Sequence, residues 1–137
     1  MKHIYIVFSL LLVMKYGVSQ PTPYNAVFDL TSSDTAVHQR VIRWVNGIIK
    51  SYPNAKLEIV FYGNSLSMVE KEKSTVAQDI HRLANSNKVT FAVCEQAMKK
   101  HQVVKNELLD GVKTVPDALF ELVSKQAEGY GYIKVTN

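Results

Sequence analysis

Residues 88–98, KVTFAVCEQAM, change their pattern half-way, and this change decides the fold. The first part, residues 88–93, is rich in β-branched and apolar side chains and predicts a buried strand. Residues 95–103 then predict a helix, because an acidic residue stands in the first turn while Lys99 and Lys100 lie further along, as the helix dipole favours. The only cysteine of the chain, Cys94, stands at the junction.

The same strand-then-helix unit recurs on both sides of this stretch. Further strands are predicted at 26–31, 56–63, 112–115 and 130–136, and further helices at 34–52, 75–85 and 117–126. Thr75 and Gln78 have the spacing of a capping box at the start of one of these helices. Alternation of five strands with four helices predicts an α/β fold of flavodoxin size, with helices on both faces of a mainly parallel five-stranded sheet. The pattern leaves the strand order open.

The N-terminal segment, MKHIYIVFSLLLVMKYGVS, has the layout of a secretory signal peptide over residues 1–19. Its apolar run from Ile4 to Met14 is eleven residues long, whereas about twenty are needed to span a bilayer. We therefore expect cleavage after Ser19, no permanent membrane anchor, and an exported protein, periplasmic or secreted. Lys15, a charge just before the expected cut, leaves an uncleaved leader as the alternative.

Removal of residues 1–19 from the 137 leaves 118 residues. We expect a flexible lead at 20–25 and one domain at 26–137, because this length suits one compact core and is too short for two. Fourteen basic residues then face twelve acidic ones, a net charge of +2 that gives no reason to expect a nucleic-acid partner. One cysteine excludes an intramolecular disulfide, so in an oxidising compartment the thiol must be buried, paired with another molecule, or used.

In parallel sheets, ligand sites lie beyond the carboxyl ends of the strands. The stretches that meet this condition are 31–33, 63–65, 94–96 and 115–117. We therefore expect Cys94 as the catalytic residue of a site whose binding residues are Gly63, Asn64, Glu95, Gln96 and Pro116. A helix N-terminus would favour the thiolate of Cys94, although the neighbouring carboxylate opposes it. The alternative is that Cys94 is a small apolar residue packed at the end of a strand.

Other candidate residues carry weaker patterns. His38, His81 and His101 lack the spacing of a zinc site, and we expect them on helix surfaces. The sequence Gly-Tyr-Gly at 129–131 precedes a strand and not a helix, which excludes a dinucleotide cradle of the usual form. We therefore expect neither a metal nor a cofactor.

Two pairs of residues have structural interpretations only. Glu70 and Glu72 alternate with lysines and predict a solvated loop. Tyr130 and Tyr132 would share one face of the last strand, where ordinary packing is favoured over a subunit contact.

The motif Val93-Cys94, followed by Ala97 and the basic pair Lys99 and Lys100, resembles the active-site segment of the DsrE-like sulfur-relay family. In place of the glycine that often follows the basic pair in the cytoplasmic carriers, this chain has His101. The similarity extends over residues 26–134 to an exported, little-characterised branch of the same superfamily, through the motifs YGNSL at 62–66, VTFAVC at 89–94, VPD at 115–117 and KQAEGYGYIK at 125–134.

This resemblance implies a three-layer α/β/α domain that assembles into homotrimers or hexamers. It also implies a cysteine that carries sulfur as a persulfide, with a thiol or persulfide donor and acceptor as partners. Two functional hypotheses follow. Either the protein binds or relays sulfane sulfur on Cys94, or it is a non-catalytic homo-oligomeric binding or scaffold protein in which the cysteine is structural.

Overall fold

The computed structural model describes residues 22–137, so the leader expected at 1–19 lies outside the described residues. Of the lead expected at 20–25, residues 22–24 have no regular structure, and Asn25 already opens the first strand. The elements in chain order are β1 (Asn25–Leu30), α1 (Thr35–Ser51), β2 (Lys56–Phe61), η1 (Ser65–Met68), α2 (Ala77–Ala84), β3 (Val89–Cys94), α3 (Glu95–His101), η2 (Lys105–Glu107), β4 (Val112–Val115), α4 (Ala118–Ala127) and β5 (Gly131–Lys134). No helix within residues 22–137 has both the length and the apolar character needed to cross a membrane.

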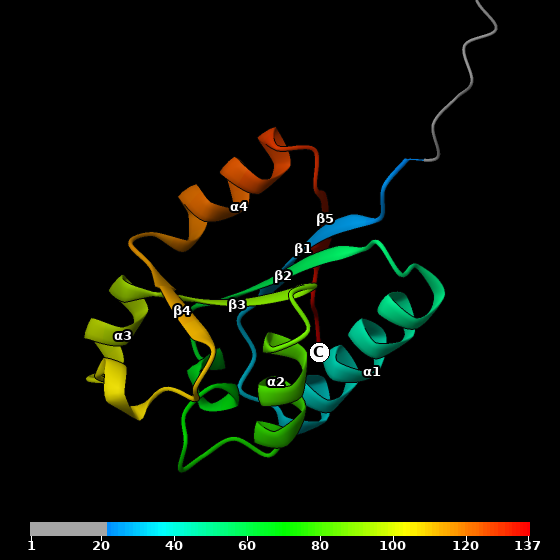
Figure 1. The fold of residues 1–137 in the computed structure, drawn as a ribbon. Helices are drawn as coiled ribbons and strands as arrows, with labels where there is room; N and C mark the ends of the chain where they lie inside the picture. Colours follow the sequence, from blue (N-terminus) through cyan, green and yellow to red (C-terminus); the bar gives the residue numbers. More distant parts are fainter. Residues whose placement is uncertain (1–21) are drawn as a thin grey trace, which may run out of the picture.

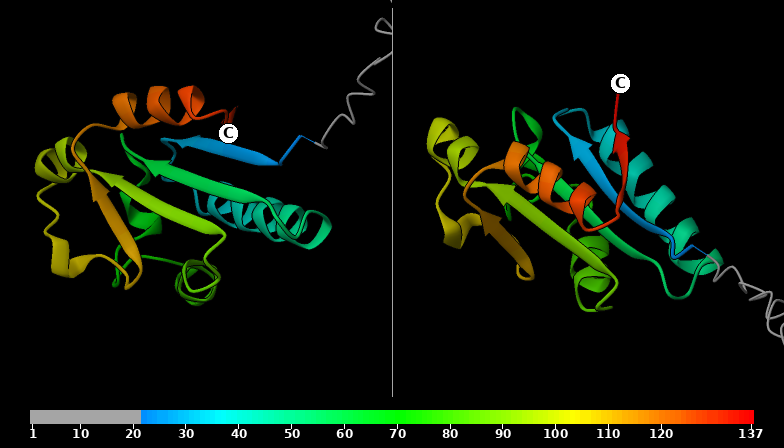
Figure 2. Two further views of the ribbon diagram at one scale, coloured as in Figure 1. Left: turned by 45° about the horizontal axis from the view of Figure 1, so that its top comes forward. Right: turned by 90° about the horizontal axis from the view of Figure 1, so that it is seen from above.

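The five strands form one sheet in the order β4-β3-β2-β1-β5, and every strand pair is parallel. Helices α1 and α2 cover one face and α4 covers the other, while α3 lies beyond the carboxyl end of β3 (Figures 1 and 2). The predicted α/β sandwich is thus confirmed. The order reverses direction after β4, because β5 returns to pair with β1, which makes the gap between β1 and β5 the topological switch point.

Acidic N-caps start two of the helices. Asp34 accepts a hydrogen bond from the Ala36 amide at 2.8 Å, and Asp117 accepts one from the Phe120 amide at 2.9 Å. The prediction of a capping box at Thr75 and Gln78 was wrong. Helix α2 begins only at Ala77 and has no side-chain cap, because the preceding turn is closed by the Ser74 hydroxyl, which accepts from the Val76 amide at 3.2 Å.

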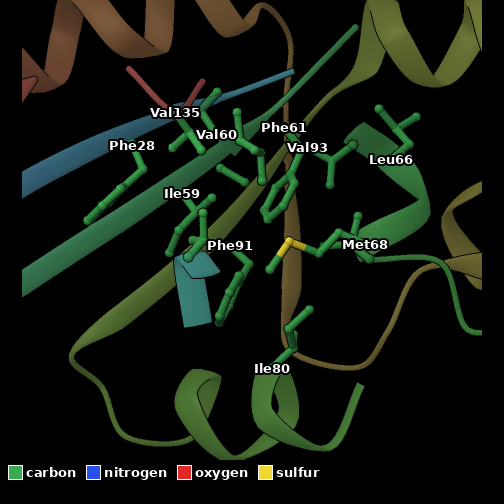
Figure 3. Packing of buried hydrophobic residues seen from close by; sticks show 14 of the residues in the cluster. Phe28, Ile59, Val60, Phe61, Leu66, Met68, Ile80, Phe91, Val93 and Val135 are labelled. Atoms are coloured by element: carbon green, nitrogen blue, oxygen red, sulfur yellow. The ribbon is translucent and has the colours of Figure 1, made fainter. Parts of the chain in front are cut away.

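The core between the sheet and helices α1 and α2 is apolar. Phe61 and Phe91 stack with ring centroids 6.2 Å apart, and Met68 and Ile80 close over them (Figure 3). Removing an aromatic ring from such a site costs about 3–5 kcal/mol, so this layer supplies much of the stability of the fold.

Two polar residues that were expected at the surface are buried. His38 lies three and seven residues before the buried Val41 and Val45, on the inward stripe of α1, and its Nε2 is 2.8 Å from the Ser32 carbonyl oxygen. Glu70 forms an isolated antiparallel β-bridge with Leu108, and its carboxylate pairs with Lys73 at 2.7 Å. His81 and His101 are exposed, as expected.

Candidate functional site

Cys94 is the last residue of β3 and is 5% exposed. Its side chain makes no capping hydrogen bond to α3, although it occupies the residue position just before that helix. Its partner in register on β4 is Val115. On the other side, the pairing of Val93 with Phe61 places Tyr62 beside Cys94. The thiol is therefore a buried group at the carboxyl edge of the sheet.

Three of the expected binding residues lie near Cys94: Glu95 and Gln96 follow it in α3, and Pro116 follows its register partner Val115. The Oε1 atom of Glu95 accepts a hydrogen bond from the Thr114 hydroxyl at 3.0 Å, which turns this carboxylate toward β4. Gln96 and Pro116 are both exposed. This group could contact a molecule that approaches the edge of the sheet above α3.

The other two expected residues, Gly63 and Asn64, lie toward β1. Gly63 has φ of +60°, a conformation that favours glycine, and the Asn64 amide donates to the Thr31 carbonyl at 3.1 Å. Asn64 lines a polar hollow of about 450 Å³ at the topological switch point; the remaining lining residues are Thr31, Ser32, Ser33, Lys134, Val135, Thr136 and Asn137. Cys94 does not line this hollow, so the expected residues share one sheet edge but form two separate groups.

A buried carboxylate organises the α4 face of the sheet. Residues opposite each other in parallel strands point to the same face, and Asp29 pairs in register with Lys134. Lys134 donates to Oδ1 of Asp29 at 2.9 Å, and the Tyr132 hydroxyl donates to Oδ2 at 2.5 Å. The hydrogen bond to this carboxylate raises the pKa of Tyr132 to about 12. Tyr130, expected in the same strand, precedes β5 and lies outside it.

Tyr62 connects this carboxylate with the cysteine. Burial and the nearby Asp29 carboxylate raise the pKa of the Tyr62 phenol well above its ordinary value, and the charge of Cys94 adds a smaller effect in the same direction. The ammonium group of Lys134 lies 5.8 Å from the centroid of the Tyr62 ring. A phenol of this kind stays protonated at neutral pH, and its hydroxyl can both donate and accept a hydrogen bond.

A second buried carboxylate, Glu58, lies under α4. Its Oε2 atom is 3.4 Å from the ammonium group of Lys113 and 3.8 Å from that of Lys125, while Oε1 has no hydrogen-bond partner. Burial and the neighbouring Glu121 carboxyl raise the pKa of Glu58 to about 7. Glu58 and Asp29 were not expected as site residues from the sequence, although each is a carboxylate that interrupts an otherwise apolar strand, and this interruption is the signal that could have identified them.

The chemistry available at this edge is that of one thiol, protonated phenols and buried carboxylates. Within residues 22–137, no three His, Cys, Asp or Glu side chains are grouped so that they could hold a metal ion. The arrangement offers a buried thiol beside the Tyr62 phenol at the carboxyl edge of the sheet.

The sequence and the fold of this chain are similar to those of known proteins. A model of the DsrE/DsrF-like family matches residues 25–135. The structure is similar to that of MTH1491, a protein of unknown function from Methanobacterium thermoautotrophicum (TM-score 0.76, 23% identity, 81% of this chain and 98% of that chain). It is also similar to the ychN protein from E. coli (TM-score 0.67, 14% identity, 82% and 98%) and to BT1422, a conserved protein of unknown function from Bacteroides thetaiotaomicron (TM-score 0.63, 13% identity, 82% and 95%). No curated protein sequence matches the chain.

Proposed function

Because this chain belongs to the DsrE/DsrF-like family, we propose that it relays sulfane sulfur as a persulfide on Cys94. The observation that carries the proposal is the position of the only cysteine of the chain. Cys94 ends β3 at the carboxyl edge of the sheet, beside Tyr62 and the polar side chains around Asp29.

In the proposed step, the Cys94 thiolate attacks the outer sulfur of a donor persulfide. A bond forms between Sγ and that sulfur, the S–S bond of the donor breaks, and the donor leaves as a thiolate that takes up a proton. An acceptor thiolate then attacks the outer sulfur of the Cys94 persulfide and releases the Cys94 thiolate. The two exchanges need no external oxidant or reductant.

Access to the sulfur requires a local opening, because Cys94 is only 5% exposed. The segment that follows it, α3, has seven residues, which is about two turns of helix. Local openings are least costly where few apolar side chains are buried, and within α3 only Ala97 and Met98 are buried. We therefore place the gate for donor and acceptor at α3.

Intact-mass measurement after treatment with polysulfide tests the proposal. Wild-type protein should gain the mass of one sulfur atom, which dithiothreitol removes, and the Cys94→Ser variant should gain nothing. Because the chain has one cysteine, the added sulfur has a single thiol to occupy. An unchanged wild-type mass under native conditions would refute the proposal.

The burial of Cys94 favours a second candidate, a non-catalytic homo-oligomeric scaffold with a structural cysteine. The two functions differ in the reactivity of the native thiol. In a sulfur carrier, the Cys94 thiol should react with iodoacetamide in the native state. A scaffold should react only after denaturation.

Two further proposals concern assembly and location. We propose that α4 forms the contact between copies in a homotrimer or hexamer, because Leu119, Phe120 and Val123 are 61%, 72% and 63% exposed on that helix.

We also propose that the protein is exported and that its leader is removed. The mass of the mature protein tests this point, because cleavage after Ser19 would leave Gln20 as the first residue.

A further inference from the structure

An apolar groove lies between α1 and the strands β1 and β5. The residues that line it are distant from Cys94 in the sequence. It has a volume of about 570 Å³, which is within the range of small-molecule sites. We call it the aromatic groove; its lining residues from α1 and its end are Arg43, Trp44, Gly47, Ile48, Ser51 and Tyr52, and those from the sheet side are Tyr24, Phe28 and Ile133.

Three aromatic rings, those of the half-buried Tyr24 and the exposed Trp44 and Tyr52, shape this groove. Tyr24 and Tyr52 lie against each other with centroids 4.7 Å apart, and Trp44 is 42% exposed. The guanidinium of Arg40 lies 5.3 Å from the centroid of the Trp44 ring and also donates to the Thr136 carbonyl, so the indole is held in place. Rigid aromatic faces of this kind favour a flat ring system over a flexible chain.

Gly47 is an exposed position on the side of α1 that lines the groove. It lies inside the 17-residue helix α1, where glycine is among the least favourable residues. Neither of the usual structural reasons for a glycine applies, because a Cβ atom at this position would meet nothing within 4 Å and the backbone is helical. The missing side chain instead leaves a notch in the helix surface between Trp44 and Ser51, which precede and follow it by about one turn.

Two arginines lie at the groove: Arg40, which contacts the Trp44 ring, and Arg43, which is a lining residue. Arg43 is the only charged residue among the lining residues. It is exposed, and within residues 22–137 it forms no ion pair. An occupant that complements the groove is therefore apolar, flat and negatively charged at one end.

We propose that the aromatic groove binds a planar aromatic anion, that is, an arene bearing a carboxylate or sulfonate. The ring system lies in the notch at Gly47 against the faces of Trp44 and the Tyr24–Tyr52 pair, and the anionic group faces Arg43. This site is independent of sulfur transfer on Cys94.

Fluorescence titration of the full chain with 1-anilinonaphthalene-8-sulfonate tests the proposal. Trp44 is the only tryptophan of the chain, so energy transfer from its emission to the probe reports binding close to the groove. N-phenyl-1-naphthylamine, which has the same rings without the sulfonate, serves as the neutral control.

Two variants separate the contributions of shape and charge. Gly47→Leu fills the notch and should weaken both probes by about tenfold or more, while its melting temperature stays equal to or above that of wild type because leucine favours the helix. Arg43→Gln should weaken the sulfonate about two- to fivefold, the range of an exposed ion pair, and leave the neutral probe unchanged. Val104→Gln, at an exposed apolar position outside the groove, should change neither.

Three results would overturn the proposal. Equal binding of the sulfonate by wild type and Gly47→Leu would place the probe elsewhere. Equal weakening of both probes by Arg43→Gln would remove the anionic requirement. Failure of the full chain to bind the sulfonate would remove the small-molecule site, and a lower oligomeric mass of Gly47→Leu would then assign the groove to a second copy of the chain.

Discussion

At the scale of single residues, two glycines have opposite roles. Gly63 has φ of +60°, and a Cβ atom there would lie 3.3 Å from the Cβ atom of Thr31, whereas Gly47 is helical with open space around it. We expect Gly63→Ala to destabilise the protein by about 1–2 kcal/mol, because an L side chain is strained in the left-handed region. Gly47→Ala should stabilise it by about 0.5–1 kcal/mol, because alanine favours the helix.

Urea unfolding of both variants checks this pair. Because the two substitutions add the same methyl group, they serve as controls for one another. A loss of stability in both would mean that Gly47 is needed for packing, which would also weaken the argument for the notch in the aromatic groove.

At the scale of the elements, the spacing of apolar residues predicted the order of strands and helices. It did so because apolar side chains fill the core between the sheet and helices α1 and α2. The rule failed where polar groups are buried with partners. His38 was expected at the surface although its position lies on the inward stripe of α1. Asp29 and Glu58 were passed over inside their strands, because the partners that satisfy them, Lys134 and Lys113, are distant in sequence and adjacent only through the strand order.

The candidate site was predicted in part for a similar reason. Residues that follow parallel strands all lie at the carboxyl edge of the sheet, and this holds for any parallel topology. Cys94 and Asn64 do lie at that edge. Whether they share one hollow depends on strand order and on the switch point between β1 and β5, which local patterns do not encode.

The packing of α4 on the sheet should depend on pH through Glu58. Its pKa is about 7 in the fold, against 4.5 for the exposed group, so the neutral form favours folding. This contribution is complete below pH 4.5 and is lost as the pH rises through 7. We expect Glu58→Gln, which mimics the neutral form, to match wild type near pH 4 and to be more stable at pH 8, by up to about 3 kcal/mol.

Urea unfolding of wild type and variant at the two pH values checks this expectation. Glu72→Gln is the matched control, because Glu72 is exposed and should show no pH-dependent gain. A variant less stable than wild type at both pH values would show that the ion pairs with Lys113 and Lys125 outweigh the cost of burying the charge.

At the scale of the whole molecule, the two faces of the sheet differ in what covers them. The face under α1 and α2 is closed by apolar packing (Figure 3). The other face is covered by α4 (Figure 2), and Lys125 of this helix lies 3.8 Å from the buried Glu58 carboxylate. The outer side of that helix is itself apolar, because Leu119, Phe120 and Val123 are spaced so that they lie on one side of it.

Such a helix needs a further layer, and a second copy of the chain can supply it. We expect wild-type protein to sediment as an oligomer, and the double variant Leu119→Gln, Phe120→Gln to sediment as a monomer, because glutamine keeps the helix but removes the apolar contact. Val104→Gln, at an exposed apolar position outside α4, should keep the wild-type mass. A monomeric wild type, or a double variant that stays oligomeric, would contradict the assignment of α4 as the contact. Sulfur loading of the monomeric variant would then show whether transfer on Cys94 needs the assembly, because a site that is complete within one chain should load to the same extent.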